Sequence, residues 1–354
     1  MTYKRPMLSK TPLRSLRLAC VVLHEDKWYR EQRMELLLGL KVEALDAAKK
    51  KVTLNDGVIF YDKCIYALGG CNFVPPFKGV DLPGVMTVRT IEDVRKIKRS
   101  ALGCDKAVII GGGVIGLEIA LELLRYGMDV TVLEALPRLM PRQLDADTSL
   151  RLQTMLTGLH ICTGVTVAEI GGDGKASYVS LADGRVFPCG LVVVSCGLKA
   201  NIAAAQAAGI RCGRAVIVNE KMETSATDIW ACGDCAEYQG VNLALWAQAV
   251  AQGEVAGANA AGGQEAISPF DASLVLNSEI MSLFALGDLG GNPDKTYECI
   301  VEERKFEEFS INKRLPFAVE KRFYCGGHMT GGCILGNLSG MEQMKQDILQ
   351  GATK

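Results

Sequence analysis

Residues 106–134 read KAVIIGGGVIGLEIALELLRYGMDVTVLE, and this segment carries the clearest pattern of secondary structure in the chain. Residues 107–110 form a short apolar run, which is typical of a parallel strand buried on both faces. A helical pattern follows over residues 114–126 and stops at Gly127, and a second strand pattern ends at Glu134. The order strand, glycine-rich loop, helix and strand predicts a βαβ unit of a parallel sheet, and hence an α/β fold.

The loop of this unit spans residues 111–116, GGGVIG, and fits the pattern G-x-G-x-x-G. Gly111 permits the tight turn, Gly113 lets the backbone approach a pyrophosphate, and Gly116 allows the helix to pack closely on the strand. The helix N-terminus adds free N–H groups and the positive end of the helix dipole, which favour phosphate. Because the loop follows a strand and opens a helix, we assign Gly111, Gly113, Ile115 and Gly116 to dinucleotide binding.

The acid that ends the second strand, Glu134, indicates which dinucleotide binds. Its carboxylate can accept hydrogen bonds from the diol of an adenine ribose, and it would repel a 2′-phosphate. Ala135 follows it directly, and the next arginine along the chain is Arg138. The sequence therefore favours NADH over NADPH.

Composition excludes several classes of protein. The 354 residues contain 39 Lys and Arg against 40 Asp and Glu, so no basic excess indicates nucleic-acid binding. The apolar stretch over residues 107–124 contains Glu118 and Glu122, which makes it a poor membrane span. Thirteen scattered cysteines do not form a secreted disulfide pattern, and residues 1–6 lack the apolar core of a signal peptide. We therefore expect a cytoplasmic protein of two or three domains.

Further motifs occur along the chain in a fixed order. They are YxRPxLSK at residues 3–10, ELxLGxxV at 35–42, YDK to GG at 61–70, RTxxD at 89–93, CGLxAN at 196–201, IWACGD at 229–234 and WxxAxxQG at 246–253. Together they resemble the pyridine nucleotide-disulphide oxidoreductase superfamily. Within it, the chain is most similar to NADH:rubredoxin reductases and to the reductase module of nitrite reductase large subunits.

This resemblance implies two Rossmann-like dinucleotide-binding domains and a small C-terminal α+β domain. The FAD-binding domain would comprise residues 1–89 and 213–267, the inserted NAD-binding domain residues 90–212, and the interface domain residues 268–354. Strand patterns near residues 296–301, 318–325 and 332–335, and a helical pattern near 341–349, fit the C-terminal domain. The implied activity is hydride transfer from NADH to FAD.

The resemblance also implies a set of site residues. In the family, a lysine on the flavin-side loop pairs with a glutamate two residues after the third glycine of the NAD motif, near flavin N5. Here these catalytic residues would be Lys10 and Glu118. The charge of Lys10 would favour the anionic reduced flavin, and Glu118 would hold the lysine. The other residues expected at the cofactors are Arg5, Pro6, Ser9, Val42, Ala67, Leu68, Gly69, Arg89, Gly197, Gly233, Asp234 and Trp246.

The chain departs from the family pattern at its amino-terminal end. Family members begin with a βαβ unit that binds the ADP half of FAD, and no second G-x-G-x-x-G precedes Gly111 here. The FAD domain is therefore expected to be truncated. Three interpretations stay open: a true start further upstream, a truncated relic, or weak or absent flavin binding. The intact remaining motifs favour the first.

The resemblance also implies the electron acceptor. Disulfide reductases of the superfamily need a cysteine beside the flavin, and residues 5–10, which match that loop, contain none, so a disulfide substrate is not expected. Cys232 and Cys235 are interpreted as structural thiols and not as a redox pair or a metal site. A small electron-transfer protein such as rubredoxin is the partner that the resemblance suggests. The basic residues among 1–18 either attract such an acidic partner or form a solvated arm, and both interpretations stay open. The alternatives are an NADH oxidase that uses oxygen or peroxide, and an NADH-binding homologue without flavin activity.

Overall fold

The computed structural model describes residues 2–9, 22–268, 272–278, 280–305 and 315–354. Lys10 lies outside these described residues. The chain divides into two compact units. Unit one comprises residues 1–6, 17–73 and 198–272, and unit two comprises residues 7–16, 74–197 and 273–354.

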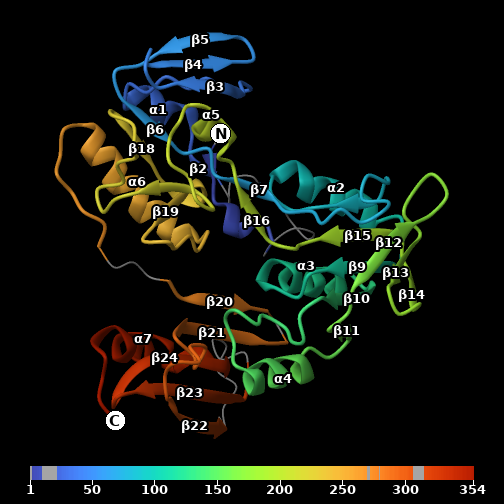
Figure 1. Cartoon of the computed structure of the whole chain (residues 1–354). Coiled ribbons are helices and arrows are strands. Elements are labelled where there is room, and N and C mark those ends of the chain that lie inside the picture. Colours follow the sequence, from blue (N-terminus) through green and yellow to red (C-terminus); the bar gives the residue numbers. More distant parts are fainter. Residues whose placement is uncertain (1, 10–21, 269–271, 279, 306–314) are drawn as a thin grey trace. The chain divides into compact units, whose positions relative to one another are not determined.

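Unit two contains the predicted βαβ unit at the centre of a parallel sheet (Figure 1). Strand β9 (Lys106–Ile110) leads into helix α3 (Val114–Arg125) and then into β10 (Asp129–Glu134). The sheet has the order β11-β10-β9-β15-β8 and is completed by β8 (Val85–Met86), β11 (Leu159–Thr163) and β15 (Leu191–Val194). Helices α2 (Ile91–Ala101) and α4 (Ala146–Met155) belong to the same unit. The strand, helix and strand predicted over residues 107–134 are confirmed.

A three-stranded antiparallel sheet covers one face of the parallel sheet. Its strands are β12 (Val167–Gly171), β13 (Tyr178–Leu181) and β14 (Val186–Pro188). Val108, Ile110 and Leu133 of the parallel sheet share one hydrophobic core with Ile170 and Val179 of this layer. Burial on both faces explains why β9 is a continuous apolar run.

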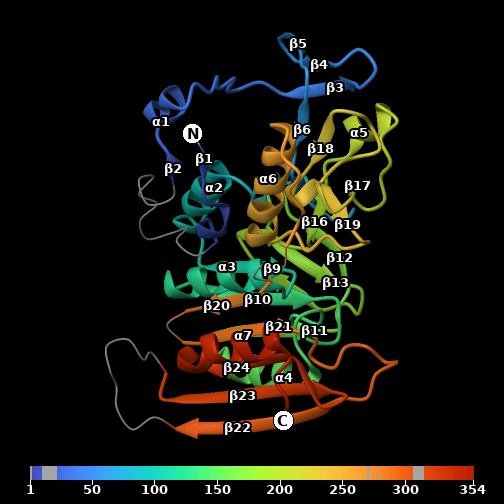
Figure 2. The same cartoon turned by 90° about the vertical axis from the view of Figure 1, so that its left-hand side faces the viewer.

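The carboxyl-terminal part of unit two forms an antiparallel sheet of order β20-β21-β24-β23-β22. Its strands are β20 (Leu274–Asn277), β21 (Ser282–Gly287), β22 (Glu298–Lys305), β23 (Phe317–Cys325) and β24 (His328–Gly336). A short 3-10 turn, η4 (Leu338–Gly340), leads into α7 (Met341–Gln350), which packs on β24 and β21 (Figure 2). The mixed α/β architecture with an antiparallel C-terminal sheet is therefore confirmed.

Unit one is built from small sheets. A meander combines β3 (Val42–Asp46), β4 (Lys51–Leu54) and β5 (Gly57–Phe60). Two parallel pairs join β6 (Cys64–Tyr66) to β18 (Ile229–Ala231), and β17 (Val216–Val218) to β19 (Ala236–Tyr238). Two antiparallel pairs join β1 (Thr2–Tyr3) to β2 (Val22–His24), and β7 (Gly70–Asn72) to β16 (Leu198–Ala200).

Helices complete unit one and enclose its core. They are α1 (Asp26–Glu31), α5 (Ala203–Ala207) and α6 (Trp246–Ala260), and short 3-10 turns occur at η1 (Arg5–Met7) and η3 (Gly233–Cys235). Tyr66, Ile229 and Trp230 of the β6–β18 pair pack with Val255 and Ala256 of α6 in one buried cluster. This packing fixes α6 beside the carboxyl ends of β6 and β18.

Candidate functional site

The glycine loop between β9 and α3 accepts only glycine at two of its positions. Gly111 has φ +115°, and a Cβ there would lie 2.2 Å from the backbone oxygen of Ser195 at the end of β15. A Cβ at Gly116 would lie 2.1 Å from the backbone oxygen of Gly111. By contrast, a Cβ at Gly113 would meet no atom of the described chain within 4 Å. Gly111 and Gly116 therefore shape the loop, and Gly113 leaves open space beside it.

The N-terminus of α3 faces this open space without a side-chain cap. Gly113 is the N-cap residue, and as a glycine it has no side chain to cap the first turn. The first N–H groups of a helix have no partner within the helix, so they are available to an anion. Val114 and Ile115 contribute these first-turn groups, and the Ile115 side chain is exposed. These residues fit a dinucleotide pyrophosphate.

Glu134 is held in place by the backbone around the glycine loop. Its Oε2 accepts a hydrogen bond from the backbone N–H of Gly112 at 2.6 Å, and its Oε1 accepts one from Leu136 at 2.8 Å. The side chain is buried at the carboxyl end of β10. A carboxylate has about four acceptor positions, so both oxygens keep capacity for ribose hydroxyls. The arrangement fits the NADH preference that we expect from the sequence.

Glu118 lies in the second turn of α3 and is hydrogen-bonded to Ser9, in the segment that the resemblance places beside the flavin. The Ser9 hydroxyl donates a hydrogen bond to Glu118 Oε2, and both side chains are buried. This contact joins residues 109 positions apart. The predicted pairing of Glu118 with Lys10 stays a prediction, because Lys10 is outside the described residues.

In unit one, the predicted FAD residues gather at the carboxyl ends of β6 and β18. Residues 67–69 follow β6, and Gly233 and Asp234 follow β18. A hydrogen bond joins the two strand ends: the backbone N–H of Cys232 donates to the backbone carbonyl oxygen of Tyr66 at 3.2 Å. Ligands of open parallel sheets bind at this edge.

Helix α6 is fixed against the same edge. Gln252, which is buried, accepts a hydrogen bond from the backbone N–H of Gly233 at 2.8 Å. The helix begins at Trp246, and its N-cap residue Leu245 makes no side-chain cap bond. An uncapped helix N-terminus near the Gly233–Asp234 turn favours the polar, partly anionic groups of a flavin nucleotide. The residues present therefore fit the FAD group that the sequence implies.

The remaining predicted residues divide between the two units. Arg5 and Pro6 lie in η1 and are exposed, and Val42 begins β3, all in unit one. Gly197 lies in unit two with φ +110°. Arg89, also in unit two, precedes α2, and its backbone N–H donates a hydrogen bond to the Asp93 side chain at 3.0 Å. Asp93 also forms a capping box with Thr90, the N-cap residue of α2. The motif RTxxD therefore builds the start of a helix.

The two cysteines around the Gly233–Asp234 turn are buried. Burial raises the pKa of both the Cys232 and the Cys235 thiol to about 11. The Cys235 Sγ also lies 3.3 Å from the Cys232 carbonyl oxygen. Because the thiolate is the reactive form, these thiols are poor nucleophiles at neutral pH.

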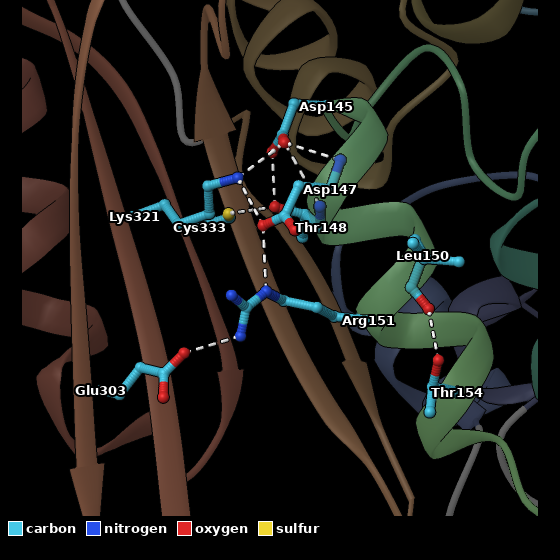
Figure 3. Close-up of polar contacts among 9 residues, drawn as sticks. All are labelled: Asp145, Asp147, Thr148, Leu150, Arg151, Thr154, Glu303, Lys321 and Cys333. Atoms are coloured by element: carbon cyan, nitrogen blue, oxygen red, sulfur yellow. Dashed lines mark hydrogen bonds and ion pairs between the residues drawn. The ribbon is translucent and has the colours of Figure 1, made fainter.

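Sequence reasoning missed two contacts between distant segments of unit two. It did not predict that Ser9 bonds to Glu118, or that Lys321 of β23 pairs with Asp145 at the start of α4 (Figure 3). One partial signal was available: Asp145, three residues ahead of Thr148, is a typical helix N-cap. The partner residues are too distant along the chain for any local pattern to reveal them.

Comparison with known proteins identifies the family. The family model described as pyridine nucleotide-disulphide oxidoreductase matches residues 1–253, which is more than half of the chain. The protein belongs to this family. The family consists of enzymes that use FAD and NADH, so the predicted resemblance, enzyme class and cofactors are confirmed.

Three similar proteins illustrate the relationship. NADH oxidase of Methanocaldococcus jannaschii is 34% identical over 87% of this chain and 70% of its own length. Nitrite reductase [NAD(P)H] of Bacillus subtilis is 32% identical over 85% of this chain, but the match spans only 38% of that longer protein. The crystal structure of NADH:rubredoxin oxidoreductase from Clostridium acetobutylicum is 27% identical, has a TM-score of 0.79, and is matched over 99% of this chain and 86% of its own.

Within the described part of the chain, none of the helices is both long enough and apolar enough to cross a membrane.

Proposed function

We propose that this member of the family takes hydride from NADH and passes the electrons, through FAD, to a small one-electron carrier of the rubredoxin type. In this proposal NADH is held by residues 90–212, and FAD by residues 1–89 and 213–267. The observation that carries the proposal is the glycine loop, with an open helix N-terminus at Gly113 and the fixed carboxylate of Glu134 beside it.

Each residue has a distinct part in the proposal. The first-turn N–H groups of α3 hold the pyrophosphate, and Glu134 orients the adenosine end by its ribose. Glu118 and Lys10 are the catalytic residues near the nicotinamide, with Ser9 holding the Glu118 carboxylate. FAD, when bound, accepts the two electrons of a hydride and releases them singly. Asp234 and the N-terminus of α6 orient that group.

The acceptor is proposed from the relatives and from the sequence. A protein named NADH:rubredoxin oxidoreductase matches nearly the whole chain. The loop over residues 5–10 contains no cysteine for thiol exchange with a disulfide. One hydride supplies two electrons, so each turnover reduces two molecules of a one-electron carrier and releases one proton.

A second candidate is an NADH oxidase that reduces oxygen or peroxide. The observation that favours it is the 34% identity to NADH oxidase of Methanocaldococcus jannaschii over 87% of this chain. The same NADH and FAD residues would serve both activities. The two candidates therefore differ only in the molecule that takes the electrons.

A spectroscopic experiment tests the proposal. The purified protein is examined for a flavin band at about 450 nm, before and after anaerobic addition of NADH. We expect a band that NADH bleaches, and faster reoxidation by rubredoxin than by dissolved oxygen in stopped-flow mixing. Faster reoxidation by oxygen would favour the oxidase. A colourless protein that takes up no added FAD would contradict both, and would favour an NADH-binding homologue without flavin activity.

A further inference from the structure

The loop between β10 and α4 is attached to the glycine loop and to α4. The backbone N–H of Met140 donates to the backbone oxygen of Gly112 at 3.2 Å. On the other side, the Ser149 hydroxyl of α4 donates to the backbone oxygen of Leu139 at 2.8 Å. Leu139, Met140 and Ser149 are all buried, so this attachment is shielded from water. The loop that follows Glu134 is therefore held between the glycine loop and α4.

Met140 shows that this attachment constrains the backbone. Its φ is +47°, a left-handed conformation that a long side chain adopts at an energetic cost. Its carbonyl oxygen accepts bonds from the backbone N–H groups of Gln143 and Leu144, both at 3.0 Å. Such a conformation persists only where neighbouring contacts enforce it.

Helix α4 is in turn fixed to the C-terminal sheet by a partly buried ion pair (Figure 3). Lys321 of β23 donates to Asp145, the N-cap residue of α4, at 2.6 Å and to Asp147 in the first turn at 3.1 Å. Asp145 also accepts bonds from the backbone N–H groups of Asp147 and Thr148. Arg151 extends the contact by bridging Asp147 and Glu303.

The Lys321 ammonium is almost completely buried, with 5% of the residue exposed. Burial alone would lower its pKa, but the hydrogen bonds to Asp145 and Asp147 outweigh this and raise it. Burial would likewise raise the pKa of Asp145, and the bonds from Lys321 and Thr148 lower it. Both groups are therefore charged at neutral pH, and the pair holds α4 through a water-poor contact.

We propose that Lys321 and Ser149 are positioning residues for NADH. They fix the loop over residues 134–145 so that Glu134 and the glycine loop are already in the binding geometry before NADH arrives. A preformed site binds more tightly because the nucleotide does not have to order the loop. The inference rests on the proposed function, in which NADH binds at this glycine loop.

The test is a titration with NADH, followed by the fluorescence of the nucleotide itself. The proteins compared are the wild type, Ser149→Ala, Lys321→Met and the double variant. Lys305→Met is the control, because Lys305 ends β22 of the same sheet and has an exposed side chain. Thermal unfolding of each sample is recorded in parallel.

We expect the dissociation constant for NADH to rise about fivefold in Ser149→Ala, which loses a neutral hydrogen bond, and about tenfold in Lys321→Met, which loses a charged contact. The control should match the wild type. Because both residues act on one loop, the affinity of the double variant for NADH should fall about tenfold. Independent effects would instead multiply to a loss of roughly fiftyfold. Turnover at saturating NADH should stay close to wild type in both single variants.

Each contrary result has a defined meaning. Unchanged NADH affinity in Ser149→Ala, in a wild type that binds NADH, overturns the positioning role and leaves the proposed function intact. If the loss of NADH affinity in the double variant equals the product of the two single losses, Ser149 and Lys321 do not act through the same loop. If Lys321→Met does not fold, Ser149→Ala still decides the question, because it removes one hydrogen bond and no charge. A wild type that does not bind NADH overturns the proposed function together with this inference.

Discussion

Glu134 Oε2 accepts a hydrogen bond from the backbone N–H of Gly112 at 2.6 Å, so the acid that we expect to select the cofactor is joined to the loop that would hold it. The other oxygen accepts from Leu136 at 2.8 Å. One side chain therefore joins the end of β10, the glycine loop and the start of the following loop. A substitution at this position has two separable consequences, one for cofactor choice and one for loop order.

Substitution Glu134→Gln should weaken the preference for NADH over NADPH. The amide keeps one acceptor oxygen for the loop, but it no longer repels a 2′-phosphate and it places an NH2 group where the second oxygen was. We expect the ratio of the two dissociation constants to move toward NADPH by about tenfold, the equivalent of about 1.4 kcal/mol. Nucleotide titration with both cofactors measures this. An unchanged ratio would contradict a role in selection, and Glu134→Ala should in addition lower the melting temperature.

Two glycines of the loop should respond in opposite ways to the same substitution. In Gly116→Ala the new Cβ would lie 2.1 Å from the Gly111 oxygen, so the melting temperature should fall. In Gly113→Ala the Cβ meets no described atom within 4 Å, so the fold should be kept. That Cβ does occupy the space where the pyrophosphate would approach, so NADH binding should weaken. Calorimetry and NADH titration on both variants check the contrast, and an unaffected affinity in Gly113→Ala would place the nucleotide elsewhere.

Ser9→Ala should slow flavin reduction by NADH. The Ser9 hydroxyl donates a hydrogen bond to the Glu118 carboxylate, and both side chains are buried. Without the hydroxyl, the Glu118 side chain loses this anchor, so the rate constant for flavin reduction should fall about fivefold, the loss of one hydrogen bond. Anaerobic stopped-flow mixing with NADH measures this rate constant.

Ser9→Thr is the matched control, because it keeps a hydroxyl at the same position. It should reduce flavin faster than the alanine variant, because the hydrogen bond to Glu118 is kept. An alanine variant that reduces flavin as fast as the wild type would show that the hydroxyl does not act on Glu118 during the reaction.

The parts of the fold that follow from local pattern were predictable from the sequence. The apolar run of β9, the glycine loop and the acid at the end of β10 each depend on neighbouring residues, and the structure places them as expected. The antiparallel C-terminal strands and the closing helix were visible for the same reason. Positions such as Gly116 are demanded by a contact with Gly111 only five residues away.

Contacts between distant segments were not predictable in this way. Ser9 and Glu118 are 109 residues apart, and Lys321 and Asp145 are 176 residues apart. Periodicity shows which face of an element is buried, but it does not show which buried polar groups will meet. Lys321 stands in a mostly buried strand, FAVEKRFYC, and a buried lysine requires an acid partner, yet the sequence does not say which acid.

The thiols of Cys232 and Cys235 should resist alkylation in the folded protein. Burial raises the pKa of the Cys232 thiol from 9.0 to about 11, which reduces the thiolate fraction at pH 8 about a hundredfold. The exposed Cys71 and Cys299 should react with iodoacetamide first. Peptide mass spectrometry after short exposure measures the order. Early labelling of Cys232 would show an accessible, reactive thiol and would contradict the burial that raises its pKa.

The ion pair of Lys321 with Asp145 should make a pH-dependent contribution to stability. The native pKa of Asp145 is lowered, since its bonds from Lys321 and Thr148 outweigh the burial that would raise it. A carboxyl group whose pKa is lower in the folded than in the unfolded state stabilises the fold above its ordinary value, about 3.9, and this contribution is lost as the pH falls through the native value. The pair should therefore contribute fully at pH 7 and little in strong acid.

The measurement compares wild type with Lys321→Met in denaturant unfolding at several pH values. At pH 7 the variant should be less stable by about 3 kcal/mol, because it leaves the partly buried Asp145 without its cation. The difference should persist down to about pH 4 and shrink below it as Asp145 is protonated. The double variant Asp145→Asn/Lys321→Met removes both charges and should recover part of the loss at pH 7. A difference that is the same at every pH would mean that Lys321 stabilises the fold by packing alone, and not through its charge.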